Sequence, residues 1–340
     1  MIIIVSLALL VASAFITRQL VMNSHRFSQM DIPNERSSHF TPTPRGGGLS
    51  FVATSIVGFL LLTLNSTIDR ADLLALCCAG IIVAIAGHLD DRQKISGATI
   101  RLGFHALGAI ILIVGIGFPS QISLFDRTID TGMIGSILGV LYLVWLLNLF
   151  NFMDGTDGIA AIEAIFVCIA GAILNYHVLS DINFSAPSII LATSTFGFLL
   201  YNWSPAKIFM GDVGSGYLGM VIGGLSLMAA KQQHELLWVW IILLAVFVSD
   251  ATVTLIRRLL RKQKPHVAHR SHAYQHLAIR FNSHSKVALI VLSINVVWLL
   301  PIAFLVANKQ LAGTTGVVVA YIPLLLAALI LNAGKDSVTN

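Results

Sequence analysis

The chain has 340 residues, of which 56% are hydrophobic and only 11% are charged, and its formal net charge is +5. Soluble domains carry about 25% charged residues, so the composition excludes an ordinary soluble protein. Apolar stretches of about 20 residues recur along the whole length, and each can cross a bilayer as a helix. Because the alternating pattern of a membrane barrel is absent, we predict an all-α, polytopic integral membrane protein.

We predict eleven transmembrane helices in one domain over residues 1–340. Residues 1–17 lack the basic start of a signal peptide, so we expect them to be retained within the first span. The predicted spans are 2–22, 46–65, 72–89, 99–118, 133–150, 158–179, 187–203, 214–230, 236–256, 286–307 and 313–333. The polar connections expected to form the functional site are 23–45, 90–98, 151–157, 204–213 and 257–285.

The distribution of lysine and arginine predicts the orientation. One side of the predicted topology carries 17 of the 21 basic residues and the other side carries 4. Such a bias marks the cytoplasmic side. We therefore expect the N-terminus outside and the C-terminus in the cytoplasm. The basic face suits anionic lipid headgroups and polyphosphate substrates.

Four polar motifs interrupt the apolar pattern, and two predicted crossings separate each motif from the next. All four should therefore meet at the cytoplasmic face. The first is Asp90-Asp91, at the end of the third span. A helix C-terminus is the negative pole of the helix dipole, so two carboxylates there need a cation. Lys94 or a divalent metal ion could supply it.

The second motif holds Asp154 and Asp157 at the start of the sixth span, where an i, i+3 spacing places them on one helical face. Asn151 adds a neutral oxygen ligand. In the third motif, Asp212 lies between glycines in a short loop and can bind a hard metal ion such as Mg²⁺. Phe209 could stack on a flat base or act as an interfacial anchor.

The fourth motif is histidine-rich and lies in the loop 257–285. His266, His269, His272 and His276 would share a face if the segment were helical. No cysteine accompanies them as in many zinc sites, and nearby basic residues, Arg270 among them, favour phosphate binding. Asp250, inside the ninth span, could be functional or could pair with Arg257. We interpret His105 as structural or interfacial.

Clustered carboxylates for one metal ion, basic groups for phosphates and an opening at the lipid boundary indicate a type of chemistry. They suit phosphoryl-type transfer from a soluble polyphosphate donor to a lipid acceptor, where the site contributes positioning and charge neutralisation. No nucleic acid partner is expected.

The motifs, in their joint order and spacing over about residues 32–276, resemble those of the polyprenyl-phosphate N-acetylhexosamine-1-phosphate transferases, the MraY/WecA-type enzymes. The matching segments are Pro33-Asn34-Glu35-Arg36-Ser37-Ser38-His39, Pro42-Thr43-Pro44-Arg45-Gly46-Gly47-Gly48, Asp90-Asp91-Arg92-Gln93-Lys94, Asn151-Phe152-Met153-Asp154-Gly155-Thr156-Asp157-Gly158 and Asn202-Trp203-Ser204-Pro205-Ala206-Lys207-Ile208-Phe209-Met210-Gly211-Asp212.

This resemblance implies that an oxygen of undecaprenyl phosphate attacks the β-phosphorus of a UDP-N-acetyl sugar and that UMP leaves. It implies a bacterial inner-membrane enzyme that uses Mg²⁺, with Mn²⁺ as the alternative, and it leaves a homodimer open. The implied catalytic residues are Asp90, Asp91, Asp154, Asp157, His269 and His272; the implied substrate-binding residues are Arg45, Lys94, Asn202, Phe209 and Arg270; the implied metal ligands are Asp212 and Asn151.

One departure bears on the donor. The peptidoglycan branch of the family carries three consecutive histidines in the last cytoplasmic loop, where this chain reads His269-Arg270-Ser271-His272. The sequence therefore looks more like the branch that initiates O-antigen or related surface glycans, with UDP-GlcNAc or a UDP-FucNAc-like donor. The alternative within the family is a phospho-MurNAc-pentapeptide transferase.

Two rival interpretations come from other classes. An ion-coupled transporter would use intramembrane acids, but the acids here gather at one predicted face and no repeat pair is apparent. A CDP-alcohol phosphotransferase would need Ala-Arg after its first acidic motif, and Asp154-Gly155-Thr156-Asp157 lacks it.

Overall fold

The computed structural model describes residues 2–24, 30–33, 41–65, 67–94, 97–125, 127–263 and 269–335. Its helices are α1 (Ile2–Met22), α3 (Leu49–Asn65), α4 (Arg70–Asp91), α5 (Ala98–Gly115), α6 (Gly132–Met153), α7 (Ile159–Leu179), α8 (Ile182–Asn202), α9 (Asp212–Gln232), α10 (Glu235–Leu243), α11 (Ala245–Leu260), α12 (Ala273–Phe281), α13 (His284–Ile294), the π-helix η1 (Asn295–Leu299), α14 (Leu300–Ala307) and α15 (Gly313–Ile330).

The helices confirm a polytopic membrane protein. Within the described residues, nine helices are long and apolar enough to cross a membrane, and the pair α10–α11 makes a tenth if it is counted as one span. The remaining predicted span corresponds to α3, whose apolar stretch, Leu49–Leu64, is shorter. The predicted span 286–307 is one continuous run, in which η1 inserts a wider turn between α13 and α14.

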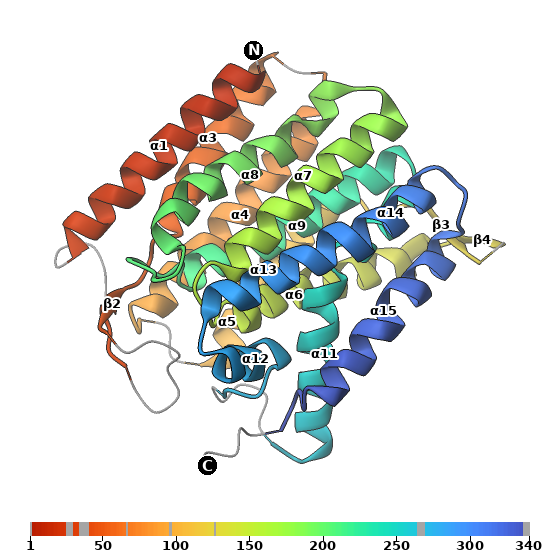
Figure 1. Ribbon diagram of the computed structural model, residues 1–340. Coiled ribbons are helices and arrows are strands. Elements are labelled where there is room, and N and C mark those ends of the chain that lie inside the picture. The colour runs from red at the N-terminus through yellow and green to blue at the C-terminus, as the bar shows by residue number, and fades with distance from the viewer. Residues whose placement is uncertain are drawn as a thin grey trace.

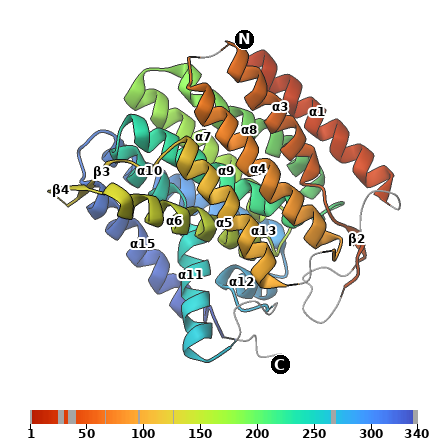
Figure 2. The same ribbon diagram turned by 180° about the vertical axis from the view of Figure 1, so that it is seen from behind.

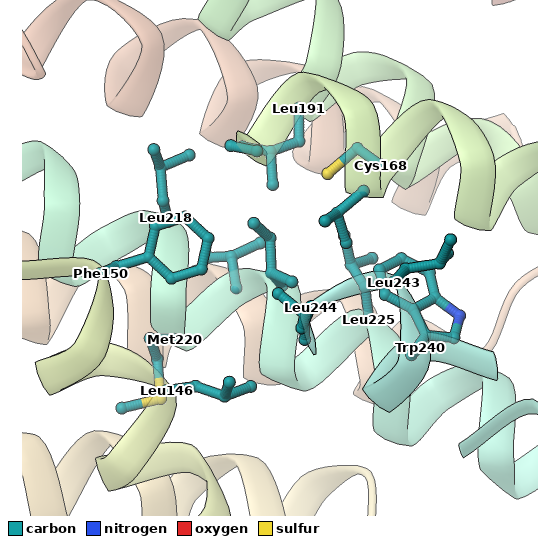
Figure 3. Packing of buried hydrophobic residues seen from close by; sticks show 14 of the residues in the cluster. Leu146, Phe150, Cys168, Leu191, Leu218, Met220, Leu225, Trp240, Leu243 and Leu244 are labelled. Atoms are coloured by element: carbon teal, nitrogen blue, oxygen red, sulfur yellow. The ribbon is translucent and has the colours of Figure 1, made fainter. Parts of the chain in front are cut away.

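Helix α9 lies in the centre of the bundle, where α4 and α6 pack against it most extensively and α10 and α7 also contact it (Figures 1 and 2). The whole apolar window of α9 is buried. Figure 3 shows Leu218, Met220 and Leu225 of this helix packed among side chains of neighbouring helices such as Phe150, Leu191 and Trp240. Because α9 is buried on every side, its sequence is apolar around the whole helix and is not amphipathic.

Two features were not predicted. The ninth predicted span is bent by 70° between α10 and α11, so α11 leaves the bundle at a steep angle (Figure 1). Two short antiparallel pairs also form, β1 (Met30–Asp31) with β2 (Thr43–Pro44) and β3 (Gln121–Leu124) with β4 (Arg127–Asp130). The pair β3–β4 and the pair β1–β2 lie at opposite ends of the bundle (Figure 2).

Candidate active site

The start of α9 is joined to the end of α4 through Asp91. Its carboxylate oxygens accept hydrogen bonds from the backbone N–H groups of Asp212, at 3.0 Å, and Val213, at 3.2 Å. Asp212 is thus the first residue of α9 rather than part of the preceding loop. The two helix ends approach closely because residue 87 is glycine, where a Cβ would lie 2.5 Å from the carbonyl carbon of Asp212.

This contact gives the Asp91 carboxylate a positive partner, which two adjacent acids at the negative end of a helix require. The N-terminus of α9 is the positive pole of a helix dipole and stabilises the Asp91 carboxylate. Asp90 receives a cation instead, because Arg101 Nη1 lies 2.7 Å from Asp90 Oδ2. Lys94, proposed from the sequence as the compensating cation, is exposed just beyond the end of α4.

A small cavity of about 10 Å³ lies beside these residues, roughly the space of one water molecule or ion. Its polar lining comes from four helices: Asp90 from α4, Arg101 and His105 from α5, Asn151 from α6 and Asp212 from α9. The Asp90 and Asp212 carboxyl groups are within hydrogen-bonding reach of each other. Asn151 Oδ1 accepts a hydrogen bond from the Ser215 hydroxyl at 2.5 Å.

The lining fits a hard divalent cation. Within the described residues, no three histidine, cysteine or acidic side chains converge as a ready-made metal cage. Mg²⁺ does not need one, because it usually keeps several waters and shares one or two carboxylates with substrate phosphates. Asp212 with the amide oxygen of Asn151 can supply that share, and the neighbouring Asp90 adds negative charge.

Asp154 and Asp157 lie on the turn between α6 and α7. Burial raises the pKa of Asp154 well above its ordinary value; Arg45 opposes this shift, while nearby Asp212 and Asp91 add to it. For Asp157, burial also favours the neutral form, but hydrogen bonds and the His284 charge outweigh it and lower the pKa. His284 Nδ1 lies 3.2 Å from Asp157 Oδ2, which also accepts the Ala206 N–H at 3.2 Å. The two carboxyls therefore differ in environment.

Asn202 is buried and connects three segments. Its Oδ1 accepts the Gly158 N–H at 3.0 Å, and its Nδ2 donates to the Ile208 carbonyl at 2.9 Å. Phe209, half-buried, is held by backbone hydrogen bonds to Pro44 and Gly47. Asn202 thus organises the turn that presents Asp157 and the loop that presents Phe209; direct contact of either residue with a nucleotide stays a prediction.

Arg45 follows β2 and faces the acids. Its Nε lies 3.1 Å from Asp31 Oδ2 of β1. Partial burial lowers its pKa, but Asp31, Asp212, Asp91 and Asp154 raise it to a net value above the ordinary one. The neighbouring motif residues 34–39 lie outside the described residues.

The histidine-rich segment reaches the same end of the bundle (α12 in Figure 1). The rings of His269 and His272 stack with centroids 5.1 Å apart, and the Tyr274 hydroxyl donates to the Phe152 carbonyl at 3.0 Å. Arg270 is half-buried, and its Nε has no hydrogen-bond partner in the part of the chain described. The condition for a shared histidine face, a helical segment, is not met at His269 and His272, because α12 begins only at Ala273; His266 lies outside the described residues.

Sequence reasoning missed two residues of the cavity. Arg101 was counted only as a topology charge, and His105 was interpreted as structural. They lie four residues apart, on one face of α5, and both line the cavity. His105 is buried, and its Nδ1 has no partner among the described residues. The sequence did offer a signal for these two residues: Arg101 and His105 form a basic pair at i, i+4 shortly after the acidic pair Asp90 and Asp91.

Residues 73–230 match the family model described as Glycosyl transferase family 4. Over these residues the chain is similar to glycosyl transferase family 4. The matched residues run from α4 to α9 and include the cavity and the Asp154–Asp157 turn, whereas Arg45 and the histidine segment lie outside them. The family resemblance predicted from the motifs is confirmed.

Named relatives agree with the family. A probable undecaprenyl-phosphate N-acetylglucosaminyl 1-phosphate transferase of Bacillus subtilis is 29% identical, over 78% of this chain and 74% of that protein. A decaprenyl-phosphate N-acetylglucosaminephosphotransferase of Mycobacterium leprae is 28% identical, over 84% and 79%. A phospho-N-acetylmuramoyl-pentapeptide-transferase of Nautilia profundicola is 28% identical, over 66% and 68%. The chain is thus similar to both branches of the family.

Proposed function

We propose that the protein transfers an N-acetylhexosamine-1-phosphate from a UDP-sugar to undecaprenyl phosphate and releases UMP. A phosphate oxygen of the lipid forms a bond to the β-phosphorus of the donor. The bond from that phosphorus to the bridging oxygen breaks, and UMP leaves with the electron pair. The observation that carries this proposal is the convergence of Asp90, Asp154 and Asp212 with Arg45 at one end of a membrane-spanning bundle.

Asp212 and Asn151 would hold Mg²⁺, with Mn²⁺ as the alternative. When bound, the ion neutralises the diphosphate and stabilises the leaving group. Asp90 is better placed than Asp91 to face the phosphates, because both Asp91 oxygens accept backbone hydrogen bonds. Asp90 can take the acceptor proton where that phosphate is singly protonated.

Basic and polar side chains would hold the rest of the substrates. Arg45, already surrounded by carboxylates, would pair with donor phosphates beside the metal ion. Lys94, His269, His272 and Arg270 would contact phosphate or sugar oxygens. Phe209 would stack on the uracil ring, with the Asp157–Asn202 network shaping its pocket.

The donor favoured by the relatives is UDP-GlcNAc. The Bacillus and Mycobacterium relatives are named for N-acetylglucosamine transfer, and both align over more of this chain than the pentapeptide-transferase relative. His269-Arg270-Ser271-His272 points the same way. A UDP-FucNAc-like donor is the alternative, and the product would begin an O-antigen or related surface polysaccharide.

The site would face the cytoplasm from the bacterial inner membrane, with the N-terminus outside. The bias of 17 basic residues to 4 supports this orientation. UDP-sugars are soluble donors, so a cytoplasmic site is also the one that the donor can reach.

UMP release by the detergent-purified protein tests the proposal. The protein would be supplied with undecaprenyl phosphate and, separately, UDP-GlcNAc, UDP-FucNAc or UDP-MurNAc-pentapeptide, with Mg²⁺ or with EDTA. We expect release that requires both lipid and metal and is fastest with UDP-GlcNAc. No release with any donor from a folded protein would overturn the proposed reaction, and preference for the pentapeptide donor would reassign the pathway.

A further inference from the structure

Asp250 is a buried carboxylate in α11, only 6% exposed, and lies outside the residues matched by the family model. The sequence leaves open whether it pairs with Arg257. In the structure Arg257 Nη1 instead donates to the Ala333 carbonyl at 2.9 Å. Asp250 therefore has other partners, and all those found lie on its own helix or at the start of α12.

Four donors meet the Asp250 carboxylate. Its Oδ1 accepts from the Ala273 N–H at 2.9 Å and the Thr254 hydroxyl at 3.1 Å, and lies 3.2 Å from His272 Nδ1. Its Oδ2 accepts from the Tyr274 N–H at 2.9 Å. A carboxylate has about four acceptor positions, so this set uses its capacity and caps α12, whose first N–H groups lack helical partners.

The contact with His272 fixes the position of the ring. Nδ1 of His272 lies 3.2 Å from Oδ1 of Asp250, and His272 also forms a capping box with Gln275 at the start of α12. Contacts to two residues therefore hold the histidine where α12 begins. A carboxylate behind a histidine is a general means of fixing ring orientation.

The segment that Asp250 holds is in contact with the candidate site. The His272 ring stacks on His269, and Tyr274, whose N–H is bonded to Asp250, donates its hydroxyl to the Phe152 carbonyl. Phe152 precedes Asp154 by two residues. On the other side, the Gly334 N–H donates to the Ser271 carbonyl at 2.6 Å. Asp250 is a charged group in this arrangement and is buried away from solvent; the buried Arg258 also reaches the segment, with its Nη1 3.5 Å from the Ser271 hydroxyl.

We propose that Asp250 is a positioning residue, which acts through His272 to hold the histidine segment against the turn that carries Asp154. The inference rests on the proposed function, because it assigns His272 a place beside the phosphates or the sugar. Asp250 itself does not touch the substrate. Its removal should impair turnover more than it impairs folding.

The first experiment compares Asp250→Asn with Asp72→Asn. Asp72 is also a buried carboxylate, 2% exposed, and it pairs with Lys231 at 2.9 Å at the opposite end of the bundle. Both variants replace one buried carboxylate by an amide of the same size. We expect Asp250→Asn to lower kcat about 10- to 100-fold, the usual cost of losing a residue that orients a ligand histidine. Asp72→Asn should retain kcat per folded molecule.

The second experiment is a double-mutant cycle with His272→Gln. If Asp250 acts through His272, Asp250→Asn should change kcat by less than about threefold in the His272→Gln background, because coupled residues are not additive. An equal loss in both backgrounds would overturn the positioning role. A loss of activity in Asp250→Asn that is fully explained by its unfolded fraction would also overturn it. So would a failure of Asp250→Glu, which keeps a carboxylate, to restore turnover.

Hydrogen exchange of the purified proteins separates this inference from the proposed reaction. We expect faster amide exchange at residues 273–274 in Asp250→Asn and unchanged exchange there in Asp72→Asn. If the wild-type protein turns over no donor, the proposed reaction fails, yet this measurement still decides the anchoring. Unchanged exchange at residues 273–274 in Asp250→Asn would overturn it.

Discussion

The carboxylate of Asp91 at the end of α4 accepts the backbone N–H of Asp212 at the start of α9, at 3.0 Å. The adjacent carboxylate, Asp90, instead meets Arg101 and lines the cavity. Two neighbouring acids thus have different environments. One anchors the helix that carries Asp212, and the other lines the cavity.

The first prediction separates these two acids. Asp91→Ala removes the cap of α9 and should cost about 1–2 kcal/mol of unfolding free energy, together with activity, because Asp212 loses its anchor. Asp90→Asn should lower turnover with little change in stability. Thermal unfolding and UMP release, measured on both variants, check this. Equal stability losses in the two variants would contradict the division of roles.

A second prediction concerns Asp212. Asp212→Asn should reduce turnover by about 100-fold or more, the scale of losing one preorganised electrostatic contact, and should weaken Mn²⁺ binding measured calorimetrically, without unfolding the protein. Asp181→Asn is a matched control, because Asp181 caps α8 by accepting the Asn183 N–H at 2.9 Å, away from the site. Near-normal activity in Asp212→Asn would refute the metal assignment.

A third prediction concerns Arg45. Arg45→Ala should raise KM for the UDP-sugar about tenfold, as expected for losing a hydrogen bond between charged groups. Its ion-pair partner Asp31 provides the control. Asp31→Asn removes the negative charge from the 3.1 Å ion pair and leaves the Arg45 charge in place, so KM should stay near the wild-type value. Unchanged kinetics in Arg45→Ala would make this residue a topology charge only.

A fourth prediction concerns pH. The pKa of Asp157 is below the ordinary value because hydrogen bonds and the His284 charge outweigh burial. A carboxyl with a lowered folded-state pKa stabilises the protein above its unfolded pKa, near 3.9, and loses that effect as the pH falls through the folded value. Wild-type melting temperature should therefore fall more steeply below about pH 4 than that of Asp157→Asn. Parallel pH profiles for the two proteins would show that Asp157 contributes nothing.

The sequence by itself determined the class of the protein, most of its spans and which end of the bundle carries the polar motifs. The length of an apolar segment decides whether it can cross a bilayer. Because two predicted crossings separate each polar motif from the next, the sequence predicted that Asp90, Asp154, Asp212 and His272 share one end. The structure brings them together there. These properties are local or countable along the chain, so no knowledge of packing was needed.

Tertiary structure alone decided which contacts each candidate site residue makes. Whether Asp90 or Asp91 faces the cavity, whether Asp250 meets Arg257 or His272, and whether His105 lines the site depend on helix rotation and on contacts between distant segments. The 70° bend between α10 and α11 was equally hidden, because hydropathy records the length of an apolar run and not its direction. Hydrogen bonds between side chains and distant backbone groups have no periodic signal in the sequence, and these bonds set the environment of each carboxylate.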